Sequence, residues 1–420
     1  MPDKAVSLPD QNFKNMKRLH FIIPLIAAIL VISCGKDDPY CKLPEDPEEP
    51  ELSYLVTPLE SSDGLKQYKI EYDTPGYDGK TVRASMLLAV PKKPNCIVSD
   101  AHYTVFSDKE VPSNTTPTLV SSSYSLLKAV WISADYIGYG TSKDHTHPYS
   151  RTYLNAKAQL NAMKVGLCYM RDSLGIDYGR LPLYLCGHSQ GGAVALATQR
   201  YLEEDKEMLK AVNFRGSYIS SGPYDMSRMM DMWVDDEVKI AYPCAIPLVI
   251  DSVMETFPDK FKGIDISDCL SKDFIDSGAV EAVRSKELEG GEINSVIFRH
   301  FNEIRGTREE HLTASEAFSP RVLAKDTVYE KIRDCLEKDN LCKGWTPSHH
   351  IELYHSHDDE IVPWEMTVEL IDYFESIGFD DFKLNGMMGD HTLSGTMFYL
   401  ALGSKLISSS ISGSGLGSSI

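Results

Sequence analysis

The sequence has few basic residues for its length. Its 420 residues include 42 Lys and Arg against 61 Asp and Glu, which gives a formal net charge of −19 at pH 7. Nucleic-acid phosphates require clustered Lys and Arg side chains. We therefore expect no nucleic-acid partner for this strongly acidic chain.

The sequence also lacks the short motifs that hold nucleotides and metals. It contains no Walker loop, no dinucleotide-binding fingerprint and no CxxC pair, each of which places backbone amides or thiolates around a ligand. It has no internal repeat. We expect no cofactor and no metal ion.

The apolar run near the N-terminus is too short to span a bilayer. It covers residues 21–32, follows the basic Met16-Lys17-Arg18 and ends at Ser33-Cys34-Gly35. This pattern is typical of a signal peptide, so residues 1–34 are interpreted as a lipoprotein signal segment. Met16 is interpreted as the true start, with residues 1–15 as a mis-called extension. A small residue followed by Cys resembles a bacterial lipobox, in which Cys34 would be acylated. The alternative is an ordinary secretory signal with an incidental Cys.

The residues after Cys34 bear on localisation. Lys36-Asp37-Asp38 resembles the export tag of Bacteroidetes surface lipoproteins. We expect an outer-membrane lipoprotein, exposed at the cell surface or else facing the periplasm. Acyl chains anchor a protein without inserting it, so the lipid anchor would be the only membrane contact.

Two segments have compositions that cannot form a core. Residues 35–52 are rich in Pro, Glu and Asp and are interpreted as a solvated spacer. Residues 408–420 are almost all Ser and Gly and are predicted to be a disordered tail. The whole chain is 42% hydrophobic and 25% charged, which allows a sizeable core between these segments.

Cysteines are few, nine in all, one of them in the predicted lipobox. An exported protein permits disulfides. Cys335 with Cys342, and Cys244 with Cys269, are candidate pairs, although sequence alone does not settle pairing. Cys186 lies in an apolar segment and is interpreted as a small buried residue.

The most informative motif present is Gly187-His188-Ser189-Gln190-Gly191-Gly192. It follows the apolar run 181–186 and precedes the small-residue helical stretch 193–197. Strand, sharp turn and helix form the setting of a G-x-S-x-G nucleophile elbow, where glycines let neighbouring chain pass close to a strained serine. The alternative is a chance pentapeptide in a Gly-rich turn.

Predicted strands and helices alternate along the body of the chain. Strand-like runs include 82–90, 129–134 and 216–220, and an apolar stripe at helical spacing runs from Leu154 to Tyr169. Such alternation predicts an α/β fold with a mostly parallel sheet and helices on both faces. Catalytic sites in such sheets form at the carboxyl ends of the strands.

The alternation stops at residue 227 and resumes near residue 351. Residues 227–346 are mixed and helix-leaning, and are interpreted as an inserted helical cap. The core would then comprise residues 53–226 and 347–407. A separate C-terminal domain is the alternative.

These motifs resemble those of the α/β-hydrolase fold serine esterases, lipases and peptidases, over roughly residues 65–405. The chain is most similar to capped bacterial hydrolases related to secreted lipases, which share the turn at 135–140, His147-Pro148-Tyr149 and Gly222-Pro223-Tyr224-Asp225. The resemblance implies an acyl-enzyme on Ser189 and a triad in the order Ser, acid, His.

The family's acid follows the seventh strand in a loop that ends in D-x-x-V-P. The segment 354–363 resembles this loop, and counting back from Val362-Pro363 identifies Asp359. Asp358, one residue away, and Asp225, after the sixth strand, remain alternatives. Asp358 and Asp359 could instead cap the helix that begins near Pro363.

The segment 386–392 resembles the last loop of the family, which identifies His391 as the base. Ser189 is a poor nucleophile until His391 accepts its proton, and Asp359 would hold the useful tautomer. A cluster of other histidines could indicate a metal site, although neighbours in a strand point to opposite faces: His349, His350, His355 and His357.

The tetrahedral oxyanion needs two preorganised donors. One is expected to be the backbone N–H of Gln190. The second should come from residues 100–104, where the family usually has His-Gly and this chain has His102-Tyr103. This departure leaves three donors open: the N–H of Tyr103, the N–H of Thr104 and the Tyr103 hydroxyl.

The substrate pocket is predicted to include Tyr136, His188, Met229, Met230 and Trp233. Methionine adapts to irregular apolar ligands, but these cap residues could equally pack the cap's own core. The resemblance implies cleavage of a carboxylic ester in a small-molecule or glycan-linked acyl substrate. A peptidase of the same fold, and a non-catalytic glycan-binding surface lipoprotein, are the alternatives.

Overall fold

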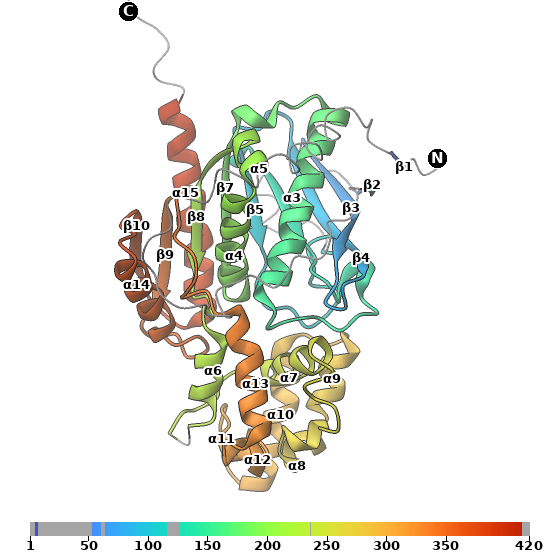
Figure 1. The fold of residues 1–420 in the computed structure, drawn as a ribbon, viewed down its shortest axis with the longest axis vertical. Coiled ribbons are helices and arrows are strands. Elements are labelled where there is room, and N and C mark those ends of the chain that lie inside the picture. The colour runs from blue at the N-terminus through green and yellow to red at the C-terminus, as the bar shows by residue number, and fades with distance from the viewer. Residues whose placement is uncertain (1–4, 7–52, 60–63, 116–126, 236, 414–420) are drawn as a thin grey trace, which may run out of the picture.

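The computed structural model describes residues 5–6, 53–59, 64–115, 127–235 and 237–413. Cys34, Cys41, the predicted spacer at 35–52 and residues 414–420 lie outside these ranges. None of the helices that the structure describes is long and apolar enough to cross a membrane. Figure 1 shows an α/β body above a helical layer.

A mixed sheet forms the centre of the body. Within the described residues, its strands follow the spatial order β1-β2-β3-β4-β6-β5-β7-β8-β9-β10. The strands from β6 to β10 in this order are parallel, and β1 to β4 are antiparallel. The strands are β1 (Ala5–Val6), β2 (Tyr54–Pro58), β3 (Leu65–Pro75), β4 (Thr81–Pro91), β5 (Cys96–Ala101), β6 (Ala129–Ala134), β7 (Pro182–His188), β8 (Asn213–Ser220), β9 (Ile351–Ser356) and β10 (Phe382–Met387).

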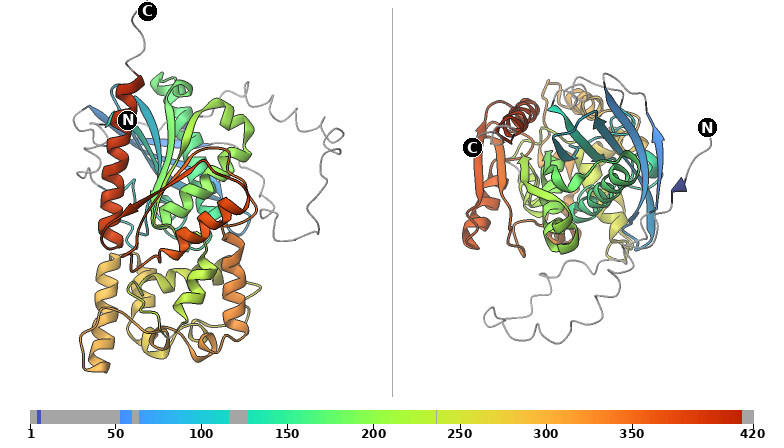
Figure 2. Two further views of the ribbon diagram at one scale, coloured as in Figure 1. Left: turned by 90° about the vertical axis from the view of Figure 1, so that its left-hand side faces the viewer. Right: turned by 90° about the horizontal axis from the view of Figure 1, so that it is seen from above.

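Helices cover both faces of the sheet, as Figure 2 shows from two sides. On one face pack α3 (Thr152–Leu174), α4 (Gln190–Glu204) and α14 (Glu365–Ser376), whose apolar side chains share one core with the strands. On the other face α15 (His391–Gly413) buries Phe398 and Leu402 against the sheet. The central strands are buried along their whole length, which explains their continuously apolar sequence. The predicted α/β fold is confirmed.

The chain between β8 and β9 is mainly helical and lies below the body in Figure 1. Pairing outside the strands is limited there to isolated bridges. The segment contains α6 (Met226–Trp233), α7 (Ala245–Thr256), η3 (Ile266–Asp268), α8 (Lys272–Asp276), α9 (Ala279–Ser285), α10 (Gly290–Arg305), α11 (Ala314–Ala317), α12 (Pro320–Leu323), α13 (Thr327–Leu336) and η4 (Glu337–Asp339). The remaining helical elements are η1 (Gly140–Ser142), η2 (Tyr178–Arg180) and α5 (Lys206–Ala211).

Polar contacts hold this helical segment against the body. The Nζ atom of Lys286, just after α9, donates to three backbone carbonyls of the loop 138–145 at 2.5 to 2.7 Å. Arg151, at the start of α3, pairs with the buried Asp339 at 2.8 Å. One continuous cluster of buried apolar side chains also runs through both parts. The helical segment is therefore packed on the body and not a separate unit with its own isolated core.

The candidate disulfides are not formed. Every cysteine that the structure describes is a free thiol, Cys244, Cys269, Cys335 and Cys342 among them. All four belong to or pack against the main cluster of buried apolar side chains, and burial raises the pKa of Cys269 to about 12 and that of Cys335 to about 11. Cys186 is fully buried, as the sequence predicts.

The predicted boundary of the C-terminal tail at residue 408 is wrong. Helix α15 continues to Gly413. Phe398, Leu402 and Leu406 recur every four residues and bury one side of this helix against the sheet. A helix anchored in this way adds further residues at little cost, because each new residue gains a backbone hydrogen bond once the helix exists.

Candidate active site

Ser189 occupies a strained turn between β7 and α4. Its φ and ψ angles are 58° and −129°, and a positive φ is uncommon for a residue other than glycine. A Cβ atom at Gly187 would lie 2.2 Å from the carbonyl oxygen of Gly191, and one at Gly191 would lie 1.9 Å from that of Ala101. Both positions therefore require glycine, and the chain has the close packing of a nucleophile elbow.

The side chain of Gln190, the first residue of α4, is held by His147. The side-chain amide of Gln190 donates to Nε2 of His147 at 2.9 Å, and Nδ1 of His147 donates to the carbonyl of Ile137 at 2.7 Å. Burial lowers the pKa of His147 to about 3, so the ring is neutral and can accept. The backbone N–H of Gln190 lies at the positive end of the helix, where no preceding turn supplies an acceptor.

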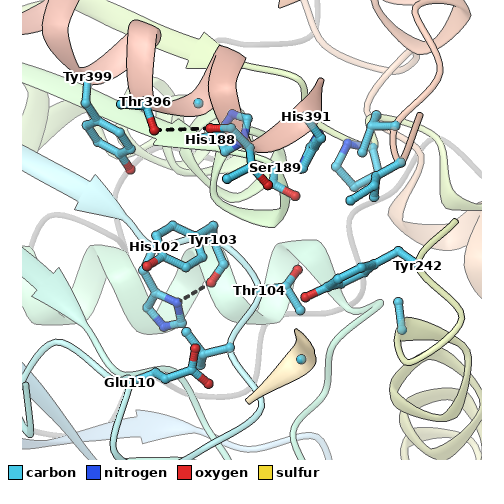
Figure 3. A pocket seen from close by; sticks show the side chains of 18 of the residues that line it. His102, Tyr103, Thr104, Glu110, His188, Ser189, Tyr242, His391, Thr396 and Tyr399 are labelled. Atoms are coloured by element: carbon cyan, nitrogen blue, oxygen red, sulfur yellow. Dashed lines mark hydrogen bonds between the residues drawn. The ribbon is translucent and has the colours of Figure 1, made fainter. Parts of the chain in front are cut away.

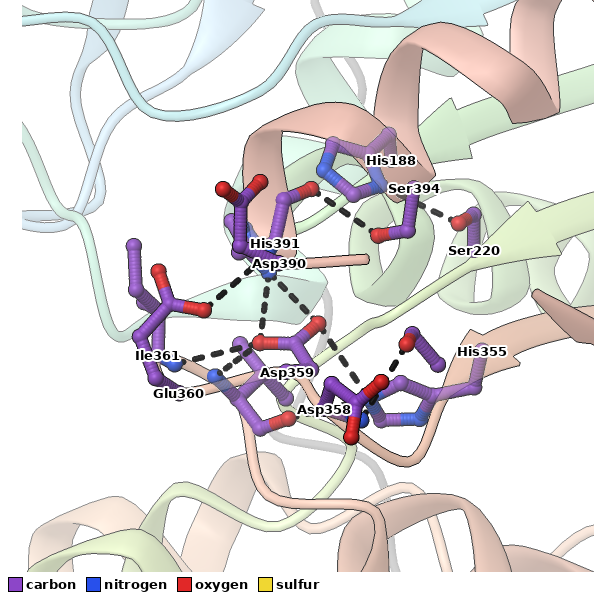
Figure 4. A network of polar contacts seen from close by, with 12 residues as sticks. His188, Ser220, His355, Asp358, Asp359, Glu360, Ile361, Asp390, His391 and Ser394 are labelled. Carbon is purple, nitrogen blue, oxygen red and sulfur yellow. Dashed lines mark hydrogen bonds and ion pairs between the residues drawn. The ribbon is translucent and has the colours of Figure 1, made fainter. Parts of the chain in front are cut away.

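Asp359 and His391 form a close pair, shown in Figure 4. Nδ1 of His391 lies 2.7 Å from Oδ2 and 2.9 Å from Oδ1 of Asp359. The backbone N–H groups of Ile361 and Val362 donate to Oδ1 of Asp359. Burial alone would raise the pKa of Asp359, but hydrogen bonds from His355 and His391 outweigh it and hold the pKa well below its ordinary value. Asp359 is therefore a fixed carboxylate against the His391 ring.

The two other candidate acids lie elsewhere. Asp358 is exposed. Asp225 caps α6, where its Oδ1 atom accepts from the N–H groups of Ser227 and Arg228, and its Oδ2 atom accepts from Asn340 at 2.8 Å. Asp359 is thus the carboxylate that bonds the His391 ring among the residues that the structure describes.

Ser189 and His391 line the same cavity, which has a volume of about 1230 Å³. His188 also lines it, with its ring centroid 4.5 Å from that of His391. In the described structure, Ser189 makes no hydrogen bond to His391. The two side chains therefore share one cavity without a direct hydrogen bond between them.

The loop after β5 forms the opposite wall of the cavity. Figure 3 shows Tyr103 and Thr104 across the cavity from Ser189 and His391. The Thr104 hydroxyl bonds the hydroxyl of Tyr149 at 2.9 Å, and Tyr103 is 50% exposed. All three donors considered for the second oxyanion position therefore belong to the cavity wall.

The predicted pocket residues divide into two groups. His188, Met229 and Trp233 line the cavity. Met230 and Tyr136 are fully buried and do not line it, so their prediction as pocket residues is wrong. Met230 lies on the inner side of α6, and the Tyr136 ring stacks on His102 at 4.0 Å while its hydroxyl donates to the carbonyl of His102.

Sequence reasoning placed residues 100–104 at the site but gave the carboxylate of Asp100 no role in the cavity. It is the penultimate residue of β5 and accepts hydrogen bonds from Cys186, Trp131 and Tyr399. Burial raises the pKa of Asp100 to about 6. Its position at the carboxyl end of a central strand was the signal that could have identified it. Other cavity residues that no motif marks are Tyr242 and Thr396.

The remaining histidines do not converge. In the part of the chain that the structure describes, no group of three or more His, Cys, Asp or Glu side chains could hold a metal ion. Each histidine has its own neighbour: His349 pairs with Glu203, His350 with Asp381 and His355 with Asp359, and His357 stacks on Trp364.

The fold is of the α/β class, and its site brings a strained serine, a histidine and a buried carboxylate to one end of the sheet. No family model matches the chain, and no curated protein sequence matches it. Among solved structures, the rice cell wall degrading esterase LipA from Xanthomonas oryzae is similar to this chain with a TM-score of 0.64 and 20% identity, covering 82% of this chain and 89% of LipA. Candida antarctica lipase A in its closed state is similar with a TM-score of 0.62 and 13% identity, covering 91% of this chain and 87% of the lipase. At these identities the likeness shows the fold, and the neighbours that share it are an esterase and a lipase.

Proposed function

We propose that the protein is a serine hydrolase that cleaves a carboxylic ester through an acyl-enzyme on Ser189. One observation carries the proposal: the strained serine at the start of α4 lines the same cavity as His391, whose Nδ1 atom is held by a buried carboxylate. The esterase and the lipase that share the fold support the same reaction class.

The mechanism follows from these positions. His391 accepts the Ser189 proton on Nε2 as Oγ attacks the ester carbonyl, and Asp359 stabilises the imidazolium that forms. The N–H of Gln190 donates to the developing oxyanion. His391 then returns the proton to the leaving alcohol. A water molecule, deprotonated by His391, releases the acid and restores Ser189.

The cavity wall supports an acyl substrate. Helix α6 contributes Met229 and Trp233, and the segment after it contributes Ile240. Apolar walls of this kind bury an acyl chain and exclude bulk water from the acyl-enzyme. We propose a small-molecule or glycan-linked acyl ester as the substrate.

A reactive-probe and substrate test would examine this proposal. A fluorophosphonate probe is expected to label wild-type protein at Ser189, and p-nitrophenyl esters are expected to turn over faster than chromogenic peptides. Faster cleavage of peptides would identify a peptidase. Absence of both labelling and turnover would contradict catalysis and favour the glycan-binding alternative.

Acyl selectivity provides a second prediction. Met229→Ala and Trp233→Ala are expected to change the preference among acyl chain lengths more than the melting temperature, because both side chains line the cavity. Met230→Ala is the matched control on the same helix. It should destabilise the protein by about 2–5 kcal/mol, as expected for a fully buried methionine, and leave the preference unchanged. Relative kcat/KM values on esters of varied length and thermal melts would measure both effects. Wild-type selectivity with reduced stability in the first two variants would contradict a pocket role.

We also propose that the mature protein is an outer-membrane lipoprotein anchored through Cys34. The lipobox-like sequence supports this proposal. Cys34→Ala is expected to move the expressed protein from the detergent phase to the aqueous phase in phase partitioning, since acyl chains provide the anchor. Retention of the variant in the detergent phase would contradict it.

A further inference from the structure

His355 is a fully buried histidine that lies directly behind the Asp359 carboxylate. Its Nε2 atom is 2.9 Å from the carbonyl oxygen of Val362 and 3.4 Å from Oδ2 of Asp359. Its Nδ1 atom is 2.7 Å from the hydroxyl of Thr367, in the first turns of α14. Asp359 therefore lies between two imidazole rings, and the mechanism uses only one of them.

These contacts determine the tautomer of His355. The carbonyl of Val362 and the carboxylate of Asp359 can only accept hydrogen bonds, so Nε2 must carry a proton. The hydroxyl of Thr367 can donate, which completes a neutral ring by bonding Nδ1. The hydrogen bonds then run from Thr367 through His355 to the carbonyl of Val362, and the same N–H lies beside Oδ2 of Asp359.

We propose that His355 is a positioning residue of the active site, which holds the carboxylate of Asp359 toward His391 and is itself oriented by Thr367. Asp359 accepts hydrogen bonds from the backbone of the loop 361–362 and from His391, and the Nε2 atom of His355 lies 3.4 Å from its Oδ2 atom. With the carboxylate fixed at both oxygens, His391 is held with Nε2 available for the Ser189 proton. This inference rests on the proposed function, because it assigns a role within that site.

The arrangement also affects how strongly His391 binds a proton. A hydrogen bond donated to a carboxylate spreads its negative charge and weakens its attraction for a neighbouring imidazolium. Loss of the His355 donor should therefore make His391 easier to protonate. The titratable groups near the pair are few and come from three segments: Asp358, Glu360, Asp390 and His188.

Replacement of His355 tests the proposal. His355→Leu is expected to lower kcat about tenfold with little change in KM, since the N–H group beside Oδ2 of Asp359 is lost. The acidic limb of the kcat/KM pH profile should move to higher pH by about 0.5 unit. His355→Gln keeps an N–H near the position of Nε2 and should restore both values toward the wild type.

Three variants separate positioning from simple packing. Thr367→Val removes the hydroxyl while keeping the shape, and should move the profile in the same direction as His355→Leu; Thr367→Ser should not. His357→Leu is the matched control two residues away, because His357 is exposed and stacks on Trp364 at 3.8 Å. It should leave both kcat and the profile unchanged.

A wild-type pH profile in both His355→Leu and Thr367→Val would overturn the proposal. If His355→Leu fails to fold, Thr367→Val alone decides between these outcomes. NMR titration of the His391 ring in wild-type and variant proteins gives a readout that needs no turnover. Absence of ester cleavage by the wild type would therefore contradict the proposed function, while an unchanged His391 titration would contradict the role of His355.

Discussion

Ser189→Ala is expected to reduce kcat on a p-nitrophenyl ester by roughly 10⁴- to 10⁶-fold while leaving the melting temperature near that of the wild type. Loss of the nucleophile leaves only substrate binding and the oxyanion donors to accelerate the reaction. The side chain of Ser189 is small and borders the cavity, so its hydroxyl is not needed to fill the core. Steady-state kinetics and thermal melts would measure the two effects.

Thr396→Ala is the matched control for this experiment. Thr396 is another hydroxyl on the cavity wall, but its Oγ1 atom only returns a hydrogen bond to the carbonyl of Thr392 within α15. This variant should keep kcat within a few-fold of the wild type. Retention of most activity by Ser189→Ala would place the nucleophile elsewhere.

Asp359→Asn is expected to lower kcat by about 10⁴-fold, because an amide that donates to Nδ1 stabilises the wrong tautomer of His391. Asp358→Asn should change kcat by no more than a few-fold, because Asp358 is exposed and does not contact the His391 ring. Both variants replace an aspartate with an asparagine, and the two positions are adjacent in the sequence. Each variant therefore serves as a control for the other.

The opposite ranking of these two variants would move the acid to Asp358. If neither variant were impaired, Asp225 would become the remaining candidate. Asp225→Asn is instead expected to reduce stability, because Asp225 caps α6 and accepts a hydrogen bond from Asn340. Comparison of kcat with melting temperature across the three variants distinguishes a catalytic role from a capping role.

The sequence by itself determined the α/β fold and the elbow. Alternating apolar runs and helical stripes predicted the sheet and its helices, because both periods follow from local backbone geometry. The glycines around Ser189 could also be recognised in the sequence. At these positions the backbone of another segment lies so close that a Cβ atom would clash with it, so only glycine fits. The resemblance of the loop before Val362-Pro363 to a family motif led to the prediction of Asp359, whose carboxylate bonds the His391 ring in the structure.

Tertiary structure alone decided features that depend on contacts between distant segments. Cys335 and Cys342 are close in sequence, but both are free thiols in the folded chain. Tyr136 and Met230 look like pocket residues in sequence, yet burial against other elements turns both away from the cavity.

His355 illustrates the same limit within the site. In sequence it belongs to a histidine cluster that resembles a metal site, and only the fold places Asp359 on one side of its ring and Thr367 on the other. Short sequence patterns predict helices and strands from their periodicity, and turns from the residue types that turns require. The partner of a buried polar atom is set by which elements meet in space, and a single sequence does not contain that information.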